Sequence, residues 1–200
     1  MLLGMLQWLV TICRPDLCHV VASLNRFGAC PRENHLDLVV RTFGYLKQVL
    51  DPRIAIDHRP LIFHRPEPDF EKLIPDFLLD YPHAKEELDP NFPPSFGPVM
   101  EQTFLTDSDH AHDQATRCSL TGYIGYVGST PVTYGARRQG SIASSTYAAE
   151  FNALRTATEE AIGLRYMLRC LGCNIPTDGL CPTKIFNDSF GVIQNCQNPA

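Results

Sequence analysis

The stretch FLTDSDH at residues 104–110 decides the predicted fold, because a short apolar run ends there in clustered acidic residues. Two more runs rich in β-branched and aromatic residues follow at 121–127 and 132–136, with Gly128 and Ser129 as a turn between them. Short runs of this composition separated by a tight turn are typical of antiparallel strands. The sequence therefore predicts a meander of three strands whose first strand ends in acidic residues.

A long helix is predicted to follow the meander. Residues 144–146 are Ser, Ser and Thr, which are favoured helix N-caps, and Gly172 is a favoured C-terminal stop. The apolar stripe expected to face the sheet consists of Phe151, Leu154, Ala161, Leu164, Leu168 and Leu171. A fourth strand is predicted over 184–188, and another helix starts over 190–194. This order of elements predicts an α/β fold with a mixed sheet and helices packed on it.

The residues before this region differ from it in character. Apolar residues recur at helical spacing through 1–50, which predicts a small, slightly basic helical segment with Trp8 in its core. Ten of the 16 prolines fall within 51–98, where acidic residues outnumber basic ones, and this density excludes long helices and central strands. We therefore predict a helical segment at 1–50, a proline-rich acidic linker at 51–98 and an α/β domain at 99–200.

Charge and cysteine content narrow the classes of function. The formal net charge is -5, whereas a chain that neutralises many phosphates usually carries a basic stripe. The 8 cysteines form no regular framework, and Cys170 and Cys173 make a C-x-x-C without a second pair at zinc-ribbon spacing. We interpret the cysteines as buried or idle intracellular thiols, with metal binding or redox chemistry as the alternative.

The apolar N-terminal stretch predicts no membrane segment. Residues 1–13 lack a basic leading region and a small-residue cleavage site, so they do not resemble a secretory signal. They are also too short to span a bilayer. We expect a soluble intracellular protein without membrane contact.

Three acidic residues occupy informative places. Asp107 ends the first strand, Glu150 lies in the first turn of the long helix, and Asp188 ends the fourth strand. If the first and fourth strands are neighbours, all three carboxylates meet at one point. Clustered carboxylates repel one another unless a cation lies between them, and oxygen ligands favour Mg²⁺ or Mn²⁺ over zinc. Two such ions would clamp a phosphodiester for attack by water. Solvated loop charges are the alternative that the pattern leaves open.

Five short sequence blocks follow one another along the C-terminal half: TDSDHAHD (106–113), SLTGY (119–123), YGARRQ (134–139), SSTYAAEF (144–151), and NDS (187–189) with GVI (191–193). In order and spacing they resemble the ribonuclease H domain of copia-type retrotransposon polyproteins. The resemblance implies a ribonuclease H-like fold that hydrolyses the RNA strand of an RNA–DNA hybrid. It also implies that Asp107, Glu150 and Asp188 bind two Mg²⁺ or Mn²⁺ ions. The implied partner is the rest of the reverse transcriptase polyprotein, and the implied location is cytoplasmic, nuclear or both.

The helical segment extends this resemblance toward the N-terminus. It looks like the tail of a copia-type reverse transcriptase in four stretches: LGMLQWL (3–9), RPDL (14–17), LNRF (24–27) and FGYLK (43–47). The family's fourth carboxylate, its late histidine and the last strand and helix of its fold would lie beyond Ala200. We therefore expect a ribonuclease H-like fold that is incomplete at its C-terminus. The alternative function is a catalytically inactive retrotransposon remnant with at most weak nucleic-acid or protein binding.

Further polar residues flank the blocks. Arg137 and Arg138 are candidate phosphate contacts near the nuclease cleft, or part of a solvated turn. His110 and His112 would share one face of a strand and suggest a metal site of another kind, but no third histidine or cysteine lies near them in sequence. Polar loop residues are therefore the favoured interpretation for them. Asp109 is interpreted as a turn residue or an outer neighbour of the carboxylate cluster.

Overall fold

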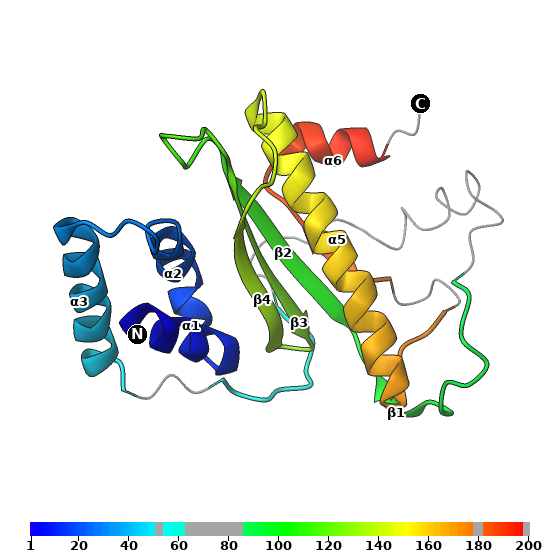
Figure 1. The fold of residues 1–200 in the computed structure, drawn as a ribbon. Helices are drawn as coiled ribbons and strands as arrows, with labels where there is room; N and C mark the ends of the chain where they lie inside the picture. The colour runs from blue at the N-terminus through cyan, green and yellow to red at the C-terminus, as the bar shows by residue number, and fades with distance from the viewer. Residues whose placement is uncertain (51–53, 63–85, 178–181, 198–200) are drawn as a thin grey trace.

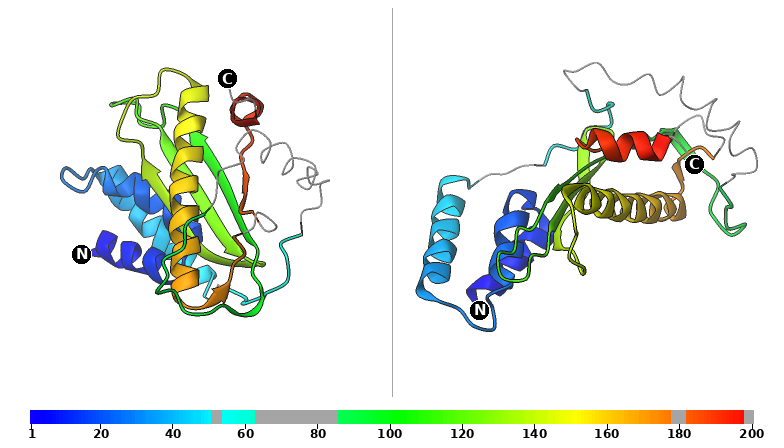
Figure 2. Two further views of the ribbon diagram at one scale, coloured as in Figure 1. Left: turned by 90° about the vertical axis from the view of Figure 1, so that its right-hand side faces the viewer. Right: turned by 90° about the horizontal axis from the view of Figure 1, so that it is seen from above.

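A computed structural model describes residues 1–50, 54–62, 86–177 and 182–197 (Figure 1). Its centre is a four-stranded sheet. The helix α5 (Thr146–Cys170) packs on one face of that sheet, and the N-terminal helices lie on the other side (Figures 1 and 2). The predicted architecture of a mixed sheet with packed helices is thereby confirmed. Among the helices of the described residues, none combines the length and apolar character needed to cross a membrane.

The central sheet has the strand order β4-β3-β2-β6. Its members are β2 (Gln102–Asp109), β3 (Leu120–Val127), β4 (Thr130–Arg138) and β6 (Lys184–Phe186). The first three form the predicted antiparallel meander, whereas β6 pairs with β2 in parallel. A second sheet consists of two parallel strands, β1 (Phe96–Val99) and β5 (Cys173–Asn174). The return of the chain through α5 thus places the fourth predicted strand beside the first.

The core between the sheet and α5 is built around Phe104, whose side chain is fully buried. On the neighbouring strand, a Cβ at Gly125 would come within 2.5 Å of the Phe104 ring, so glycine leaves the space that the ring occupies. The buried face of α5 is mostly alanine: Ala149, Ala153, Ala157 and Ala161. Because these side chains are small, the helix lies close to the sheet, and Leu164 completes the contact.

The predicted ends of α5 agree with its observed caps. The Ser145 hydroxyl accepts a hydrogen bond from the backbone N–H of Ala148 at 3.1 Å. After the helix ends, Gly172 adopts a φ of +77°, the left-handed conformation that favours glycine. A shorter helix, α6 (Phe190–Gln197), follows β6 and contacts α5.

The predicted apolar stripe of α5 is wrong in part. Leu164 and Ala161 are buried as expected, but Phe151 is 44% exposed and Leu171 is 64% exposed. The helix turns its alanine face toward the sheet, and Ala157 and Ala161 on that face share a buried cluster with Phe104. Periodicity alone favoured the larger residues and so placed the stripe too far round the helix.

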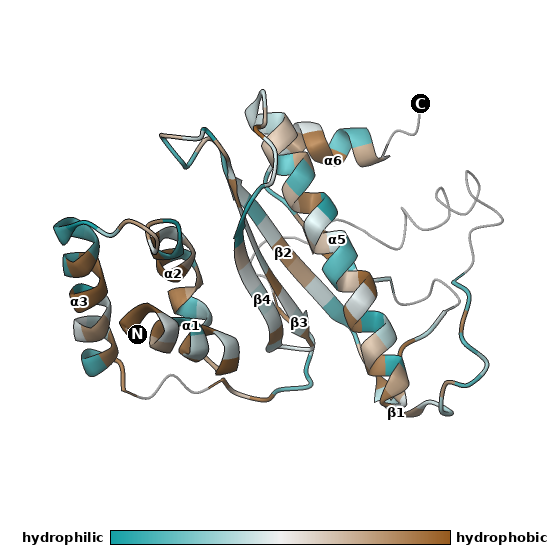
Figure 3. Ribbon diagram, in the orientation of Figure 1, coloured by the Kyte–Doolittle hydropathy of each residue, from teal (hydrophilic) through white to brown (hydrophobic). Residues whose placement is uncertain are grey.

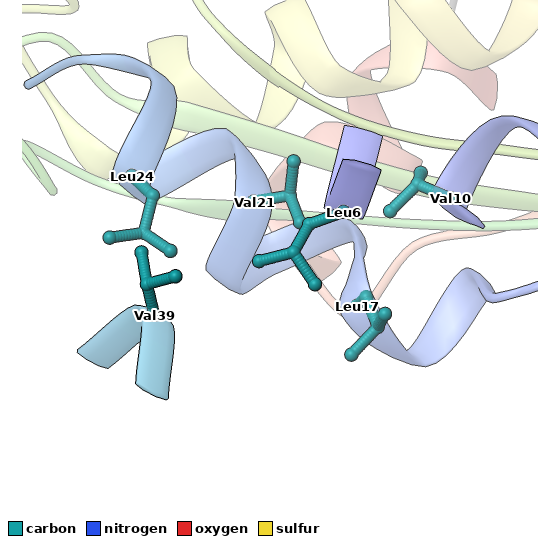
Figure 4. Packing of buried hydrophobic residues seen from close by; sticks show 6 residues of the cluster. All are labelled: Leu6, Val10, Leu17, Val21, Leu24 and Val39. Carbon is teal, nitrogen blue, oxygen red and sulfur yellow. The ribbon is translucent and has the colours of Figure 1, made fainter. Parts of the chain in front are cut away.

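Residues 1–50 are helical, as the sequence predicts. The elements are α1 (Leu2–Ile12), the 3₁₀ turn η1 (Pro15–Leu17), α2 (Cys18–Asn25) and α3 (Glu33–Gln48). Their buried side chains form one cluster (Figure 4): Leu6, Val10, Leu17, Val21, Leu24 and Val39. Trp8 was expected in this core, but it is 64% exposed. Leu6 and Val10 occupy the inner face of α1. Trp8 is two positions from each of them and therefore lies on the opposite side of the helix.

The helical segment is joined to the sheet through β4. The Tyr134 hydroxyl donates a hydrogen bond to the Val10 carbonyl at 2.8 Å, and its ring packs against the helical cluster. Both α1 and α3 contain many hydrophobic residues (Figure 3), and among them Met5 and Val40 are exposed. Of the predicted linker at 51–98, residues 51–53 and 63–85 lie outside the described residues, and its limits stay a prediction.

Candidate metal centre

The pairing of β2 with β6 brings two of the predicted carboxylates to one edge of the sheet. In this parallel pair, Leu105 is opposite Phe186. Asp107 and Asp188 each lie two residues further along, so they lie toward the same end of this strand pair. Asp107 is still paired with Gly122 in the sheet, because β2 continues to Asp109 and does not end at Asp107 as predicted. The helix α5 adds Glu150, which is its fifth residue and follows its first turn rather than lying in it as predicted. One carboxylate oxygen of each of the three residues lies within 4.8 Å of the other two. The structure thus brings together the three carboxylates that the sequence singled out.

Glu150 is the buried member of this carboxylate cluster, with 5% of its surface exposed. Its Oε1 accepts a hydrogen bond from Ser108 Oγ at 2.7 Å, and its Oε2 accepts one from Asn187 Nδ2 at 2.9 Å. Both partners are neutral, and no ion pair within the described part of the chain includes Glu150. Burying a carboxylate among neutral partners is costly unless a cation compensates its charge. A cation at this point would compensate the charge of Glu150, so Glu150 could serve as one of its ligands.

Asp107 and Asp188 form the open side of the cluster, since both are exposed to solvent. The Oδ1 atom of Asp107 accepts a hydrogen bond from the backbone N–H of Ser108 at 2.7 Å, which fixes its direction. The donor set contains carboxylate oxygens alone, so it fits the hard cations Mg²⁺ and Mn²⁺ better than zinc, which usually takes nitrogen or sulfur ligands. An ion held here would be enclosed on the side of Glu150. On the side of Asp107 and Asp188 it would be open to solvent and to a further ligand.

Sequence reasoning missed the two residues that orient Glu150. Successive side chains of a strand point to opposite faces, so Ser108 faces α5 together with Phe104, while Asp107 does not. Asn187 follows β6 directly and also donates to the Thr106 carbonyl at 3.4 Å. Both residues are polar and adjacent in sequence to a predicted ligand, since Ser108 follows Asp107 and Asn187 precedes Asp188. This adjacency was the sequence signal that could have identified them.

Comparison with known proteins establishes a relationship for nearly the whole chain. Over 198 residues, 99% of its length, the chain is 23% identical to the "Retrovirus-related Pol polyprotein from transposon RE1" of Arabidopsis thaliana. It is 22% identical over the same length to the corresponding polyprotein from transposon RE2 of that plant. The chain is similar to retrotransposon polyproteins. It spans 11% of the length of each of these relatives, so it matches a short segment of them.

This relationship confirms the polyprotein resemblance but not the finer features inferred from it. The retrotransposon-related chain is also 23% identical over 166 residues to the "Secreted RxLR effector protein 161" of Plasmopara viticola, a match that covers 83% of the chain and 90% of that protein. No protein-family model matches the chain, and no solved structure matches it. The ribonuclease H-like fold accordingly stays a prediction beyond the observed mixed sheet.

The two arginines predicted as phosphate contacts lie on opposite faces of β4, because they are adjacent in a strand. Arg137 extends along α5, where its Nη2 lies 2.9 Å from Glu160 Oε1. Arg138 points to the other face, with its Nη1 3.9 Å from Asp113 Oδ2. Their side chains are 62% and 51% exposed. They do not form a single basic patch, so each must be judged separately as a nucleic-acid contact.

His110 and His112 do not share one face of a strand, and their favoured interpretation as polar loop residues agrees with the structure. β2 ends at Asp109, and both histidines lie in the turn that follows, where Ala111 has a φ of 53°. The Nε2 atom of His110 lies 3.2 Å from the Ala143 carbonyl oxygen, whereas the Nδ1 atom of His112 lies 2.5 Å from Asp109 Oδ2. The turn separates the two rings, which a strand would have aligned.

The interpretation of the described cysteines as idle thiols stays a prediction. None of them forms a disulfide, including Cys170 at the end of α5 and Cys173 in β5. No cluster suited to a metal within the described residues contains a cysteine. Burial, with a smaller effect from the Asp16 charge, raises the pKa of Cys18 to about 11, which keeps its thiol protonated.

Proposed function

We propose that this polyprotein segment carries a ribonuclease H-like site that hydrolyses the RNA strand of RNA–DNA hybrids with Mg²⁺ or Mn²⁺. The observation that carries the proposal is the meeting of Asp107, Glu150 and Asp188 from two parallel strand ends and one helix start. The relationship to retrotransposon polyproteins supports it. On this proposal the partners are an RNA–DNA hybrid and the rest of the polyprotein.

The protein's own groups divide the work at the proposed site. Glu150 is held in place by Ser108 and Asn187, so it binds a cation with little reorganisation. Asp107 and Asp188 are exposed and hold the cation on the side where a phosphodiester can approach. When bound, one or two divalent ions would activate a water molecule and stabilise the leaving oxygen.

Recognition of the hybrid would rely on backbone contacts, because proteins recognise A-form helices mostly by shape and by phosphate and 2′-hydroxyl groups. We keep Arg137 and Arg138 as separate candidate phosphate contacts. A phosphate contact contributes affinity that falls with salt, so replacing the arginine that touches the hybrid should reduce the salt dependence of binding. The formal net charge of -5 makes bound cations an essential part of any approach to a polyanion.

Cleavage of a labelled RNA–DNA hybrid tests the proposal. The purified chain should release RNA fragments in Mg²⁺ or Mn²⁺ and stop when EDTA is added. Asp107→Asn removes one ligand charge and should abolish cleavage, whereas Asp37→Asn on the exposed side of α3 should retain it. Equal cleavage by the wild type and Asp107→Asn would show that the carboxylate cluster is not the active site.

A catalytically inactive remnant is the second candidate function. The acidic net charge favours it, as does the presence of only three carboxylates in the cluster that the described residues form. The same assay separates the two functions, provided that circular dichroism shows the wild-type chain to be folded. A folded chain that leaves the hybrid intact in both metals would identify the remnant.

A further inference from the structure

A second cluster of metal-binding side chains lies at the junction between the helical segment and the sheet. His19 comes from α2, while Asp109 and His112 come from the end of β2 and the turn that follows it. One donor atom of each residue lies within 4.8 Å of the other two. The rings of His19 and His112 meet edge to face, with centroids 5.3 Å apart. The third ligand that was missing from the neighbourhood of His112 in sequence is therefore supplied by a helix about 90 residues earlier.

We propose that His19, Asp109 and His112 bind a zinc ion that fastens the N-terminal helices to the sheet. Two imidazole nitrogens and one carboxylate oxygen are ligands that zinc accepts in a tetrahedral site, and a water molecule or another ligand takes the fourth position. This donor set differs from the neighbouring carboxylate cluster, which offers oxygen alone and favours Mg²⁺ or Mn²⁺. The two sites therefore select different classes of cation.

The surroundings of His112 match those of a metal-binding histidine. Its Nδ1 faces Asp109, and its Nε2 lies 3.3 Å from the hydroxyl oxygen of Ser23. A histidine that binds zinc through one ring nitrogen usually donates its other N–H to an oxygen acceptor, which fixes the ring and its tautomer. The Ser23 hydroxyl oxygen can be that acceptor. Ser23 is thus a positioning residue, and it comes from the same helix as His19.

Only small side-chain movements are needed to admit the ion. The His112 Nδ1 and Asp109 Oδ2 atoms are 2.5 Å apart, whereas two ligand atoms on one tetrahedral zinc ion are about 3.4 Å apart. The Asp109 side chain is 58% exposed and His19 is exposed, so both can rotate without disturbing the core. The ion would replace the direct contact between Asp109 and His112.

The proposed ion reinforces a junction that already exists. Arg26 is the residue after α2 and forms an ion pair with Asp113, which follows His112. The Arg26 Nη2 and Asp113 Oδ1 atoms are 2.5 Å apart. Zinc would add a second cross-link between the same two segments. A ligand that binds only the folded chain raises its stability with ligand concentration, so zinc should raise the melting temperature. Asp107, Asp109 and His19 line one common pocket, so the junction borders the carboxylate cluster.

Titration of the metal-free chain with Co²⁺, a coloured substitute for zinc, tests this site. Excess Mg²⁺ is present throughout, so that the carboxylate cluster is occupied. The wild type should develop the visible absorption of four-coordinate Co²⁺ at one equivalent, and added zinc should remove that absorption. His19→Ala should weaken binding by more than tenfold, and Ser23→Ala by about tenfold, since outer partners of zinc ligands contribute 10- to 100-fold. His58→Ala removes an exposed histidine outside the cluster and should bind as the wild type does.

Three outcomes would overturn the proposal. One is the absence of any Co²⁺ absorption in the wild type. Another is binding that is as tight in His19→Ala and Ser23→Ala as in the wild type. The third is a strong near-ultraviolet band from thiolate ligands, which would show that cysteines hold the ion. Circular dichroism of each variant shows whether it is folded, so that binding is compared between folded proteins. If His19→Ala is unfolded, the comparison of Ser23→Ala with the wild type tests the site.

Discussion

Replacing Asp107 by asparagine should stabilise the chain when no metal is bound. Asp107 lies within 4.8 Å of two other carboxylates. A like-charge pair at that separation costs about 0.9 kcal/mol in water and about 3.5 kcal/mol at an effective dielectric constant of 20. Because Asp107 and Asp188 are exposed, solvent screening keeps their repulsion near the lower value. Asparagine retains the Oδ1 acceptor for the Ser108 N–H, so removing the charge should raise the free energy of unfolding by about 1 to 2 kcal/mol.

Thermal unfolding in EDTA and in excess Mg²⁺ measures this effect. For a chain of this size, the expected gain raises the melting temperature by about 2–8 °C in EDTA. The order should invert in excess Mg²⁺, because the cation stabilises the wild type more than a variant that lacks one ligand. Asp37→Asn is the matched control on α3 and should change little in either buffer. An Asp107→Asn variant that is less stable in EDTA, or that gains as much from Mg²⁺ as the wild type, would refute the reasoning.

Two predictions concern the framework around the site. Gly125→Ala should lower the free energy of unfolding by about 1–3 kcal/mol in urea titrations, because the new methyl group would lie 2.5 Å from the Phe104 ring. An unchanged midpoint of urea unfolding would contradict the tight packing. Glu86 forms ion pairs with Arg169 and Arg165. Burial alone would raise the pKa of Glu86, but hydrogen bonds and charge from the two guanidinium groups outweigh burial and lower this pKa from 4.5 to about 2. A carboxyl group with a lowered pKa stabilises the fold above pH 4.5 and loses that contribution as the pH falls toward 2, so urea unfolding across this range should show a steeper loss for the wild type than for Glu86→Gln. Parallel losses in the two proteins would show that this ion pair contributes little.

The carboxylate cluster was predictable because each member occupies a position that chain direction fixes. A strand end and a helix start determine where Asp107, Asp188 and Glu150 point once β2 and β6 are neighbours. The sequence could suggest that pairing through the alternation of strands and helix, and the structure confirms it. What holds Glu150 in place was not predicted, because the contacts of Ser108 and Asn187 depend on the exact depth at which α5 lies on the sheet.

The features that sequence patterns did not predict have a common physical origin in side-chain direction. The exposure of Phe151 depends on how α5 rotates about its axis, and the alanine face beneath it gave no stronger apolar signal than the predicted stripe. The separation of His110 from His112 depends on a turn with a positive φ at Ala111. The approach of His19 to His112 depends on how the helical segment docks on the sheet, a contact between residues that are far apart in sequence. Local periodicity does not encode any of these three features.

The central claim is that Asp107, Glu150 and Asp188 form a divalent-cation site, and Mn²⁺ binding tests it most directly. Free Mn²⁺ gives a sharp electron paramagnetic resonance signal that is lost on binding, so titration of the chain yields the affinity. The wild type should bind Mn²⁺, and Glu150→Gln should bind it at least tenfold more weakly, because the variant removes the buried ligand charge. Glu159→Gln changes an exposed glutamate on the same helix and should bind as the wild type does. Equal Mn²⁺ affinities for Glu150→Gln and Glu159→Gln would contradict the account.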